Sequence, residues 1–369
     1  MRADMTQPDA FEEKSIPPES GNDDGLRPPG GGVAAARKIL IGFALVVVFG
    51  GGYYLWHRHS RGPIEIAYAG NRHVAIWNTT AQVREQVETV SYGTPLDVLQ
   101  RYEDQLEVRS SNGAVGWVSE RDVLSADLWL KARDLEESVA KMPVEARGHT
   151  RVIANLHILP GRDSARVRQL DKDVPVDLFL RKPLDVPVTP NANDAEESTV
   201  EPPEAKKEDW WLIQAHTGDN EGVAGWVLGR FLALDVPEPL PDYASSAGVH
   251  IISWAVLNQV RDAAGKLHPQ YLLLATKGLE GQPCDFTMLR AYTWGMKSQR
   301  YETAFVESEL CGMLPLHVTA ATQVGGEATF SFQDEDEGGS ELRTYHMHET
   351  IIRREREEGE PERSGKRER

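Results

Sequence analysis

The two cysteines are the side chains whose type is best suited to covalent chemistry. Cys284 and Cys311 stand 27 positions apart, on either side of a segment with the pattern of a β-hairpin. In an oxidising compartment a disulfide between them would close this loop, with a chain-entropy gain of about 3 to 4 kcal/mol. The alternative is a pair of unbridged small core residues, and the sequence leaves both open. No histidine accompanies either cysteine in a catalytic pattern, so thiol catalysis is not indicated.

Histidines and carboxylates near the C-terminus have the right chemistry for a metal ion but form incomplete sets. His346 and His348 would share one face of a strand beside Glu349, yet the sequence places no third imidazole or thiol with them. The acidic run from Asp334 to Glu337 does not match a twelve-residue calcium loop and predicts a solvated turn. We therefore expect no metal site and no cofactor.

Known catalytic motifs do not occur in the sequence. It has no Gly-x-Ser-x-Gly, no phosphate-binding glycine-rich loop and no His-Glu-x-x-His, and its carboxylates form no recognisable acid/base pair. The 369 residues carry a formal net charge of −17 without a local basic face, which argues against a nucleic-acid partner. The sequence thus predicts that the chain is not an enzyme and assigns no catalytic residue.

An internal repeat gives the clearest structural pattern. The tripeptide GWV occurs at 116–118 and again at 225–227, and the segments around it align, GAVGWVSERDVL with GVAGWVLGRFLAL. Before the first GWV, apolar residues alternate with polar ones as in half-buried strands, and Asn112-Gly113 is a hairpin turn signal. Two similar β units are therefore expected.

The two units resemble the bacterial SH3 domain, a small five-stranded barrel, in tandem copies. The matching residues of the first copy are Gly93, Leu96, Val98, Leu99, Leu106, Val108, Gly113, Gly116, Trp117, Val118 and Leu124. The matching residues of the second copy are its opening at 155–163, then Leu170, Val174, Val176 and Leu178, and its GWV ending. The second copy departs from the family by an insertion at 182–208, rich in Pro, Glu and Asp, which is expected to loop out as a flexible excursion.

The resemblance implies a role for the two tryptophans and a class of ligand. Trp117 and Trp226 are expected either to close the barrels as core or rim aromatics or to stack on a ligand. Bacterial SH3 domains of exported proteins often bind cell-wall peptide or another protein. The implied partner is therefore peptidoglycan or an envelope protein.

A membrane anchor is predicted ahead of the repeat. Eighteen residues from Ile39 to Trp56 carry no charge, which is roughly 27 Å of helix at about 1.5 Å per residue and just enough to span a bilayer. A buried core helix would show a polar face, and a cleaved signal peptide would need its Ala67-Tyr68-Ala69 site closer to the apolar run. We expect an uncleaved, single-pass anchor with a cytoplasmic N-terminus and the bulk of the chain in the periplasm or outside the cell.

The predicted fold class is mainly β. After the proline-rich stretch 236–241, strand-like runs separated by turns predict a β-rich C-terminal domain, either a barrel or a sandwich. The predicted segments are a disordered tail (1–36), a transmembrane helix (37–58), SH3-like domain 1 (64–125), a connecting helix (126–146), SH3-like domain 2 (147–235), the β-rich domain (243–352) and a charged tail (353–369).

The sequence supports two main functional hypotheses. The first is a membrane-anchored envelope protein whose tandem SH3-like modules bind cell-wall or protein partners without catalysis. The alternative is a cell-wall or protein hydrolase in which those modules target a catalytic C-terminal domain. A scaffold or sensor that connects the N-terminal tail to an external ligand is a third. The oligomeric state is not indicated by any feature of the sequence.

Overall fold

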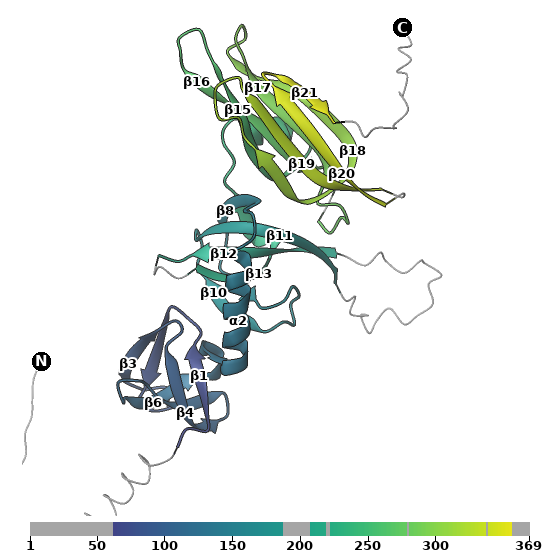
Figure 1. Ribbon diagram of the computed structural model, residues 1–369. Helices are drawn as coiled ribbons and strands as arrows, with labels where there is room; N and C mark the ends of the chain where they lie inside the picture. Colours follow the sequence, from purple (N-terminus) through teal and green to yellow (C-terminus); the bar gives the residue numbers. More distant parts are fainter. Residues whose placement is uncertain (1–61, 187–206, 219–221, 279, 337–338, 356–369) are drawn as a thin grey trace, which may run out of the picture. The chain divides into compact units, whose positions relative to one another are not determined.

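Regular structure in the described part of the chain is mostly β-sheet. The computed structural model describes residues 62–186, 207–218, 222–278, 280–336 and 339–355 (Figure 1). They contain three antiparallel sheets of seven strands each. The described residues from Pro63 onward group into one unit. The chain is therefore mainly β, as predicted.

The first sheet is built from short strands with alternating burial. Its strands are β1 (Glu65–Ala69), β2 (His73–Trp77), β3 (Gln86–Ser91), β4 (Pro95–Tyr102), β5 (Gln105–Arg109), β6 (Val115–Ser119) and β7 (Val123–Ser125), paired in the order β3-β2-β6-β5-β4-β1-β7. Every second residue of the central strands points into one apolar core, which includes Ile76, Leu96, Val98, Leu106, Val108 and Val118.

The second sheet repeats this arrangement strand for strand. Its strands are β8 (Ala146–Thr150), β9 (Ala154–His157), β10 (Arg166–Leu170), β11 (Pro175–Asp185), β12 (Lys207–His216), β13 (Gly222–Leu228) and β14 (Leu232–Leu234), paired in the order β10-β9-β13-β12-β11-β8-β14. A short 3-10 turn precedes the last strand in both sheets, η1 (Glu120–Asp122) and η2 (Gly229–Phe231). The repeat in the sequence is thus also a repeat of topology.

The glycine of each GWV motif lies where two strands approach closely. A Cβ on Gly116 would sit 2.4 Å from the backbone oxygen of Trp77, and a Cβ on Gly225 would sit 2.9 Å from the Cβ of Leu156. The tryptophan that follows each glycine then pairs with the neighbouring strand, β2 or β9. Close approach at this crossing is therefore the physical reason for glycine at both positions.

The predicted barrel form of these two units is not confirmed. Among the described residues, β3 and β7 each pair on one side only, and so do β10 and β14. The strand pairings therefore do not close into a ring, and the units are described as two seven-stranded sheets.

Helix α2 (Ala126–Val139) lies within the segment where a connecting helix is expected and contacts both sheets. Ser125 caps its start by accepting a hydrogen bond from the backbone N–H of Leu128 at 3.2 Å. Near this end, the ring of Trp129 stacks on Tyr68 of the first sheet at a centroid distance of 4.9 Å. At the other end, Val139 is buried against the second sheet.

The third sheet is a meander in which neighbours in sequence are neighbours in space. Its strands are β15 (His250–Arg261), β16 (Leu267–Thr276), β17 (Phe286–Gly295), β18 (Arg300–Thr319), β19 (Glu327–Asp336), β20 (Gly339–His348) and β21 (Ile351–Arg354). One face carries a core that includes Phe286, Phe330, Phe332 and Tyr345. The other face packs against a short helix, α3 (Leu240–Ser246).

Two predicted boundaries change. The insertion expected at 182–208 begins and ends inside a hairpin, because Lys182 pairs with Trp210 and Asp185 with Lys207, which extends β11 and β12. The charged tail was expected to begin at Arg353. Its first two residues instead belong to β21, where Arg354 pairs with Tyr345.

The described residues include no helix that has both the length and the apolar character to cross a membrane. The predicted span at 37–58 and the tail at 1–36 lie outside the described residues. The predicted anchor therefore stays a prediction.

Gly116→Ala should destabilise the protein. Its Cβ would collide with backbone atoms of β2 that cannot move aside without breaking the sheet, and such overpacking costs about 1 to 3 kcal/mol. Gly62→Ala is the control, because nothing lies within 4 Å of its Cβ position. Thermal unfolding of the two variants measures the difference, and equal melting temperatures would contradict the close approach.

Candidate functional site

The outer surface of the first sheet carries a row of aromatic side chains. Trp77 on β2 and Trp117 on β6 are paired directly across the strands, so their side chains lie on the same face. Their neighbours Ile76 and Val118 are fully buried in the core on the opposite face. Tyr102, at the end of β4, is 54% exposed, and its ring makes an edge contact with Trp117 at a centroid distance of 6.5 Å. We name Trp77, Tyr102 and Trp117 the open aromatic face.

A cation lies over one ring of the open aromatic face. The guanidinium carbon of Arg84 is 4.2 Å from the ring centre of Trp77, within the range of a cation–π contact. Arg84 is exposed, so its charge is accessible to an anionic group on a ligand. Among the described residues, none of the three rings belongs to a hydrophobic cluster. The face therefore offers planar apolar surface next to a positive charge.

The same face of the second sheet is covered by α2. Trp226 pairs with Leu212 across β13 and β12, as Trp117 pairs with Glu107 in the first sheet. Leu212 is buried in one cluster with Val139 of α2, and Trp226 packs against that cluster. The helix thus occupies in the second sheet the surface that is open in the first.

Two register-matched differences explain why α2 covers only one of the faces. Leu180 pairs with Leu212 in the second sheet at the positions held by Gln100 and Glu107 in the first. When a helix covers leucine side chains, each Å² of apolar surface removed from water contributes about 25 cal/mol of favourable free energy. At Gln100 and Glu107 the same apolar helix face would bury less apolar surface and would therefore gain less free energy.

The two tryptophans singled out by the sequence consequently have different surroundings. Trp117 is half-buried on an open surface next to an exposed tyrosine. Trp226 is half-buried against the cluster beneath α2. A shared motif has therefore produced one candidate ligand-stacking residue and one packing residue.

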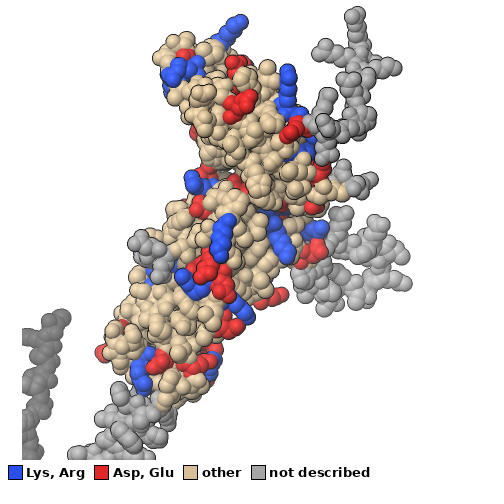
Figure 2. All heavy atoms as spheres, viewed as in Figure 1, with Lys and Arg blue, Asp and Glu red and all other residues tan. Residues whose placement is uncertain are grey.

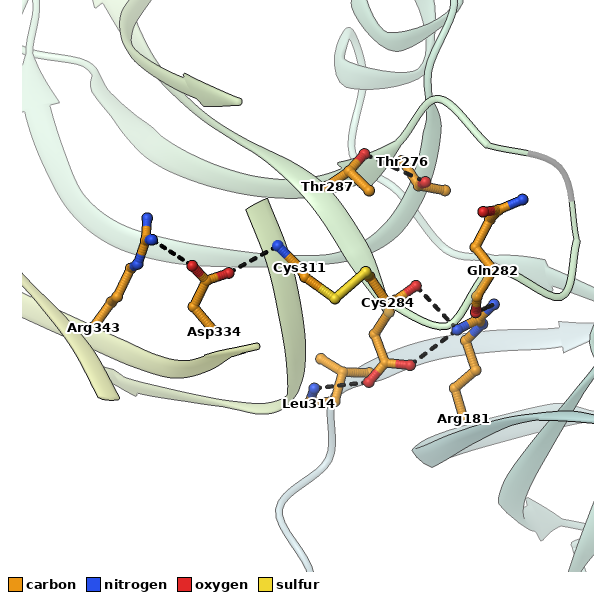
Figure 3. Close-up of a disulfide and its surroundings, with 10 residues drawn as sticks. Arg181, Thr276, Gln282, Cys284, Thr287, Cys311, Leu314, Asp334 and Arg343 are labelled. Carbon is orange, nitrogen blue, oxygen red and sulfur yellow. Dashed lines mark hydrogen bonds and ion pairs between the residues drawn. A yellow bond between two sulfur atoms is a disulfide. The ribbon is translucent and has the colours of Figure 1, made fainter. Parts of the chain in front are cut away.

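A second region of interest joins the second sheet to the third around the disulfide (Figure 3). Cys284 and Cys311 are bonded to each other, which is one of the two alternatives left open by the sequence, so neither thiol is free. Asp334 accepts a hydrogen bond from the backbone N–H of Cys311 at 2.8 Å and forms an ion pair with Arg343 at 2.5 Å. Asp334 is 3% exposed, so the solvated turn predicted for the acidic run is wrong at this residue.

Arg181 connects the two sheets at this place. Its side chain is 3% exposed and forms ion pairs with Asp209 of the second sheet at 2.6 Å and with Asp285 of the third sheet at 3.1 Å. It also donates to the carbonyl oxygens of Cys284 at 3.2 Å and Gln282 at 3.0 Å. Burial raises the pKa of Asp285, an effect opposed by the backbone N–H of Leu314 and by Arg181. We name Arg181, Asp209 and Asp285 the arginine junction.

Glu145 is a second buried carboxyl between these two sheets. One of its oxygens accepts from the backbone N–H of Leu316 at 2.9 Å, and the other is buried without a partner among the described residues. Its carbonyl accepts from the hydroxyl of Ser253. Burial raises the pKa of Glu145 to about 7, partly opposed by the Leu316 N–H and reinforced by the charge of Asp285.

Sequence reasoning did not find the arginine junction, because Arg181 lies 28 positions from Asp209 and 104 from Asp285. The available signal in the sequence was Asp285, which directly follows Cys284.

His346 and His348 are both exposed on β20, and His346 contacts Glu355 at 3.3 Å. In the part of the chain that is described, no three histidine, cysteine or acidic residues are grouped as metal ligands.

Comparison with known proteins assigns no family to the chain. No family model matches the sequence, and no curated protein matches it. Among solved structures, an NlpC/P60 family protein from Bacillus cereus matches with a TM-score of 0.20 and 11% identity over 50% of this chain and 62% of that one. NlpC2 and NlpC1 from Trichomonas vaginalis match with TM-scores of 0.16 and 0.15, at 10% and 11% identity, over 79% and 77% of this chain and 96% and 87% of theirs. The chain thus spans less than two thirds of the Bacillus cereus protein.

One expectation from the sequence is corrected by these matches. The chain was expected not to be an enzyme, whereas the solved structures that it resembles are NlpC/P60 and NlpC proteins. The exclusion of catalysis is therefore withdrawn. TM-scores of 0.20 and below assign neither a fold nor a reaction to this chain.

Arg181→Met should destabilise the protein strongly. It leaves Asp209 and Asp285 buried without their counter-charge, and breaking a buried ion pair on one side costs about 3 to 5 kcal/mol. Arg147→Met is the matched control, because Arg147 is 76% exposed where it pairs with Asp177 and such pairs contribute about 0 to 1 kcal/mol. Denaturant unfolding compares the two, and equal losses would contradict a buried junction.

The stability of the protein should fall between mildly acidic and neutral pH because of Glu145. Its carboxyl binds a proton in the folded state up to a pH of about 7 but only up to about 4.5 when unfolded. The contribution of this carboxyl to the free energy of unfolding is therefore complete below a pH of about 4.5 and is lost as the pH rises through about 7. Glu145→Gln mimics the protonated form and should flatten this slope in denaturation measured from pH 5 to 8. Glu137→Gln, at an exposed position on α2, should leave it unchanged.

Proposed function

We propose that the protein binds peptidoglycan through the open aromatic face of its first sheet, and that the first two sheets are SH3-like units. The observation that supports this most directly is the row formed by the exposed Tyr102 and the half-buried Trp77 and Trp117, with Arg84 over the ring of Trp77. Flat rings with polar edges suit the faces of sugar rings and peptide groups, and a guanidinium suits the carboxylates of wall peptides.

The second sheet acts in this proposal as a platform rather than as a second ligand site. Its equivalent face is filled by α2, whose Val139 is buried with Leu212. Trp226 is half-buried against the cluster that contains Val139, so less of its ring is available to a ligand. One binding face for each chain is therefore the expected stoichiometry.

A cell-envelope location is part of the proposal. The Cys284–Cys311 disulfide is typical of chains that fold in an oxidising compartment. The predicted apolar span at 37–58 would anchor the chain in the membrane. On the face shown in Figure 2, acidic and basic side chains are interspersed, so that face carries no single-sign patch that would favour a polyanion.

A hydrolase that acts on the cell wall or on protein is the second candidate function. The NlpC/P60 and NlpC matches are compatible with it. Both cysteines of the chain are in the disulfide, so a hydrolytic step here would use an activated water or a hydroxyl nucleophile rather than a thiolate. This candidate requires release of soluble fragments, whereas binding alone does not.

Purified peptidoglycan should retain the full chain, and loss of the open aromatic face should abolish this retention. Trp117→Ala and Tyr102→Ala are each expected to weaken binding about tenfold, as central aromatic residues of interfaces do. Leu130→Ala is the control, because Leu130 is 62% exposed on α2 and lies outside the face. Co-sedimentation with isolated wall material measures the bound fraction, with soluble glycan strands and stem peptides as separate competitors.

Retention of a Trp117→Ala/Tyr102→Ala double variant at the level of the unchanged protein would contradict the proposed face. The supernatants of the same samples are assayed for released fragments. Release above that of a heat-inactivated sample would support the hydrolase candidate, and its absence together with specific binding would support the binding function.

A further inference from the structure

The third sheet holds a cavity that is separate from the open aromatic face and from the arginine junction. It has a volume of about 340 Å³ and lies between α3 and strands β17 and β18. The residues that line it are Tyr243, Ser246, Ala247, Arg290, Tyr292, Tyr301 and Thr303. Three tyrosines and one arginine in a cavity of this size are the composition of a small-molecule site.

Arg290 lines this cavity without a hydrogen-bond or ion-pair partner among the described residues. Among the described residues, its guanidinium makes no hydrogen bond or ion pair, and its Nε is buried. Its cross-strand neighbours are Leu273 and Val306, which offer no acceptor. The carboxylate next along β18, Glu307, is paired with Arg343 instead.

Tyr292 provides a second, independent sign of an unfilled site. Its side chain is 3% exposed, and its hydroxyl is buried without a hydrogen-bond partner in the described residues. A buried donor without a partner is destabilising, so native proteins rarely keep one without a ligand or water to satisfy it. Two such donors line the same cavity.

The aromatic walls determine what else a ligand must carry. The rings of Tyr243 and Tyr292 stack at a centroid distance of 5.4 Å, and Tyr301 contacts Tyr271 at 5.4 Å and Trp294 at 5.3 Å. Burial raises the pKa of Tyr301, and Tyr271 and Tyr243 reinforce the effect, so its hydroxyl stays neutral. No carboxylate is among the lining residues.

From these contacts we infer that the cavity binds a small organic carboxylate, with Arg290 and the hydroxyl of Tyr292 as the donors to its oxygens. The planar guanidinium can donate two parallel hydrogen bonds to a carboxylate. The tyrosine rings accommodate the hydrocarbon part of the ligand. The inference goes beyond the proposed binding of peptidoglycan and does not depend on it, because it concerns a different sheet and different residues.

Benzoate is the probe for this site, and benzamide is its neutral counterpart. Benzoate should bind the full chain, measured by calorimetry and by the shifts of tyrosine ring signals, and benzamide should bind at least tenfold more weakly. Arg290→Gln should weaken benzoate binding about tenfold to a hundredfold, and Tyr292→Phe by a few-fold. Arg300→Gln makes the same charge change at an exposed position outside the cavity and should have no effect.

Acetate and phosphate distinguish the determinants of binding. Weaker binding of acetate would support a contribution from the rings, and a preference for phosphate over benzoate would overturn the carboxylate assignment. Equal binding of benzoate and benzamide, or no binding of either, would overturn the site itself.

The melting temperature of the Arg290→Gln variant separates a ligand-binding role of Arg290 from a purely structural one. A structural role predicts a lower melting temperature. Because the guanidinium is unpaired, Arg290→Gln should leave the melting temperature of the ligand-free protein unchanged or raise it. A clear decrease would mean that Arg290 supports the fold, and it would contradict the inference. Trp117→Ala should leave benzoate binding intact, so failure of this site and failure of the proposed function are distinguishable.

Discussion

The buried guanidinium of Arg181 is the interaction on which the connection between the second and third sheets depends. A side chain that is 3% exposed and still charged must be surrounded by acceptors, and Arg181 finds two carboxylates and two backbone carbonyls. The contacts continue into the third sheet, because Asp285 follows Cys284, the disulfide leads to Cys311, and Asp334 ties Cys311 to Arg343 (Figure 3). Charge pairing and a covalent bond thus stabilise the same few strands.

The tandem sheets show that a repeated fold need not leave the same surface open. Both have the same strand order and the same close glycine at the central crossing. One cross-strand pair on the face opposite the core differs in polarity, with Gln100 and Glu107 in one sheet and Leu180 and Leu212 in the other. That difference favours a covering helix on the second sheet, where Leu212 is buried with Val139 of α2. The topology alone therefore does not determine whether this face is covered.

The sequence predicted the local features of the chain and missed most of the long-range ones. The alternation of residues around Leu96 and Leu106, the GWV endings and the apolar spacing at 126–146 are local patterns, and a mainly β chain follows from them. The burial of Asp334 could not be foreseen, because its partners Cys311 and Arg343 are brought to it only by the order of strands. In the sequence, an acidic run that is partly buried by its partners looks the same as one that is fully solvated.

The candidate sites were predictable to different degrees for the same reason. Trp117 could be singled out because a motif marks it, but whether its face was open depended on where α2 packs. The Arg290 cavity has no motif, since its residues come from α3, β17 and β18. Its arginine stands out only once the ion pairs of the other arginines in the sheet are known.

The buried and half-buried arginines of the last two sheets argue for a ligand at that cavity. Arg181 has two carboxylate partners, and Arg343 has three in Glu307, Asp334 and Glu341. Each therefore has its desolvation offset from within the chain. Arg290 lies in the same kind of sheet but between Leu273 and Val306, with an unpaired tyrosine hydroxyl beside it. A guanidinium keeps its charge at any physiological pH, and none of the described residues supplies a counter-charge to Arg290, so a bound carboxylate would complete this cavity as the carboxylates complete the other two arginines.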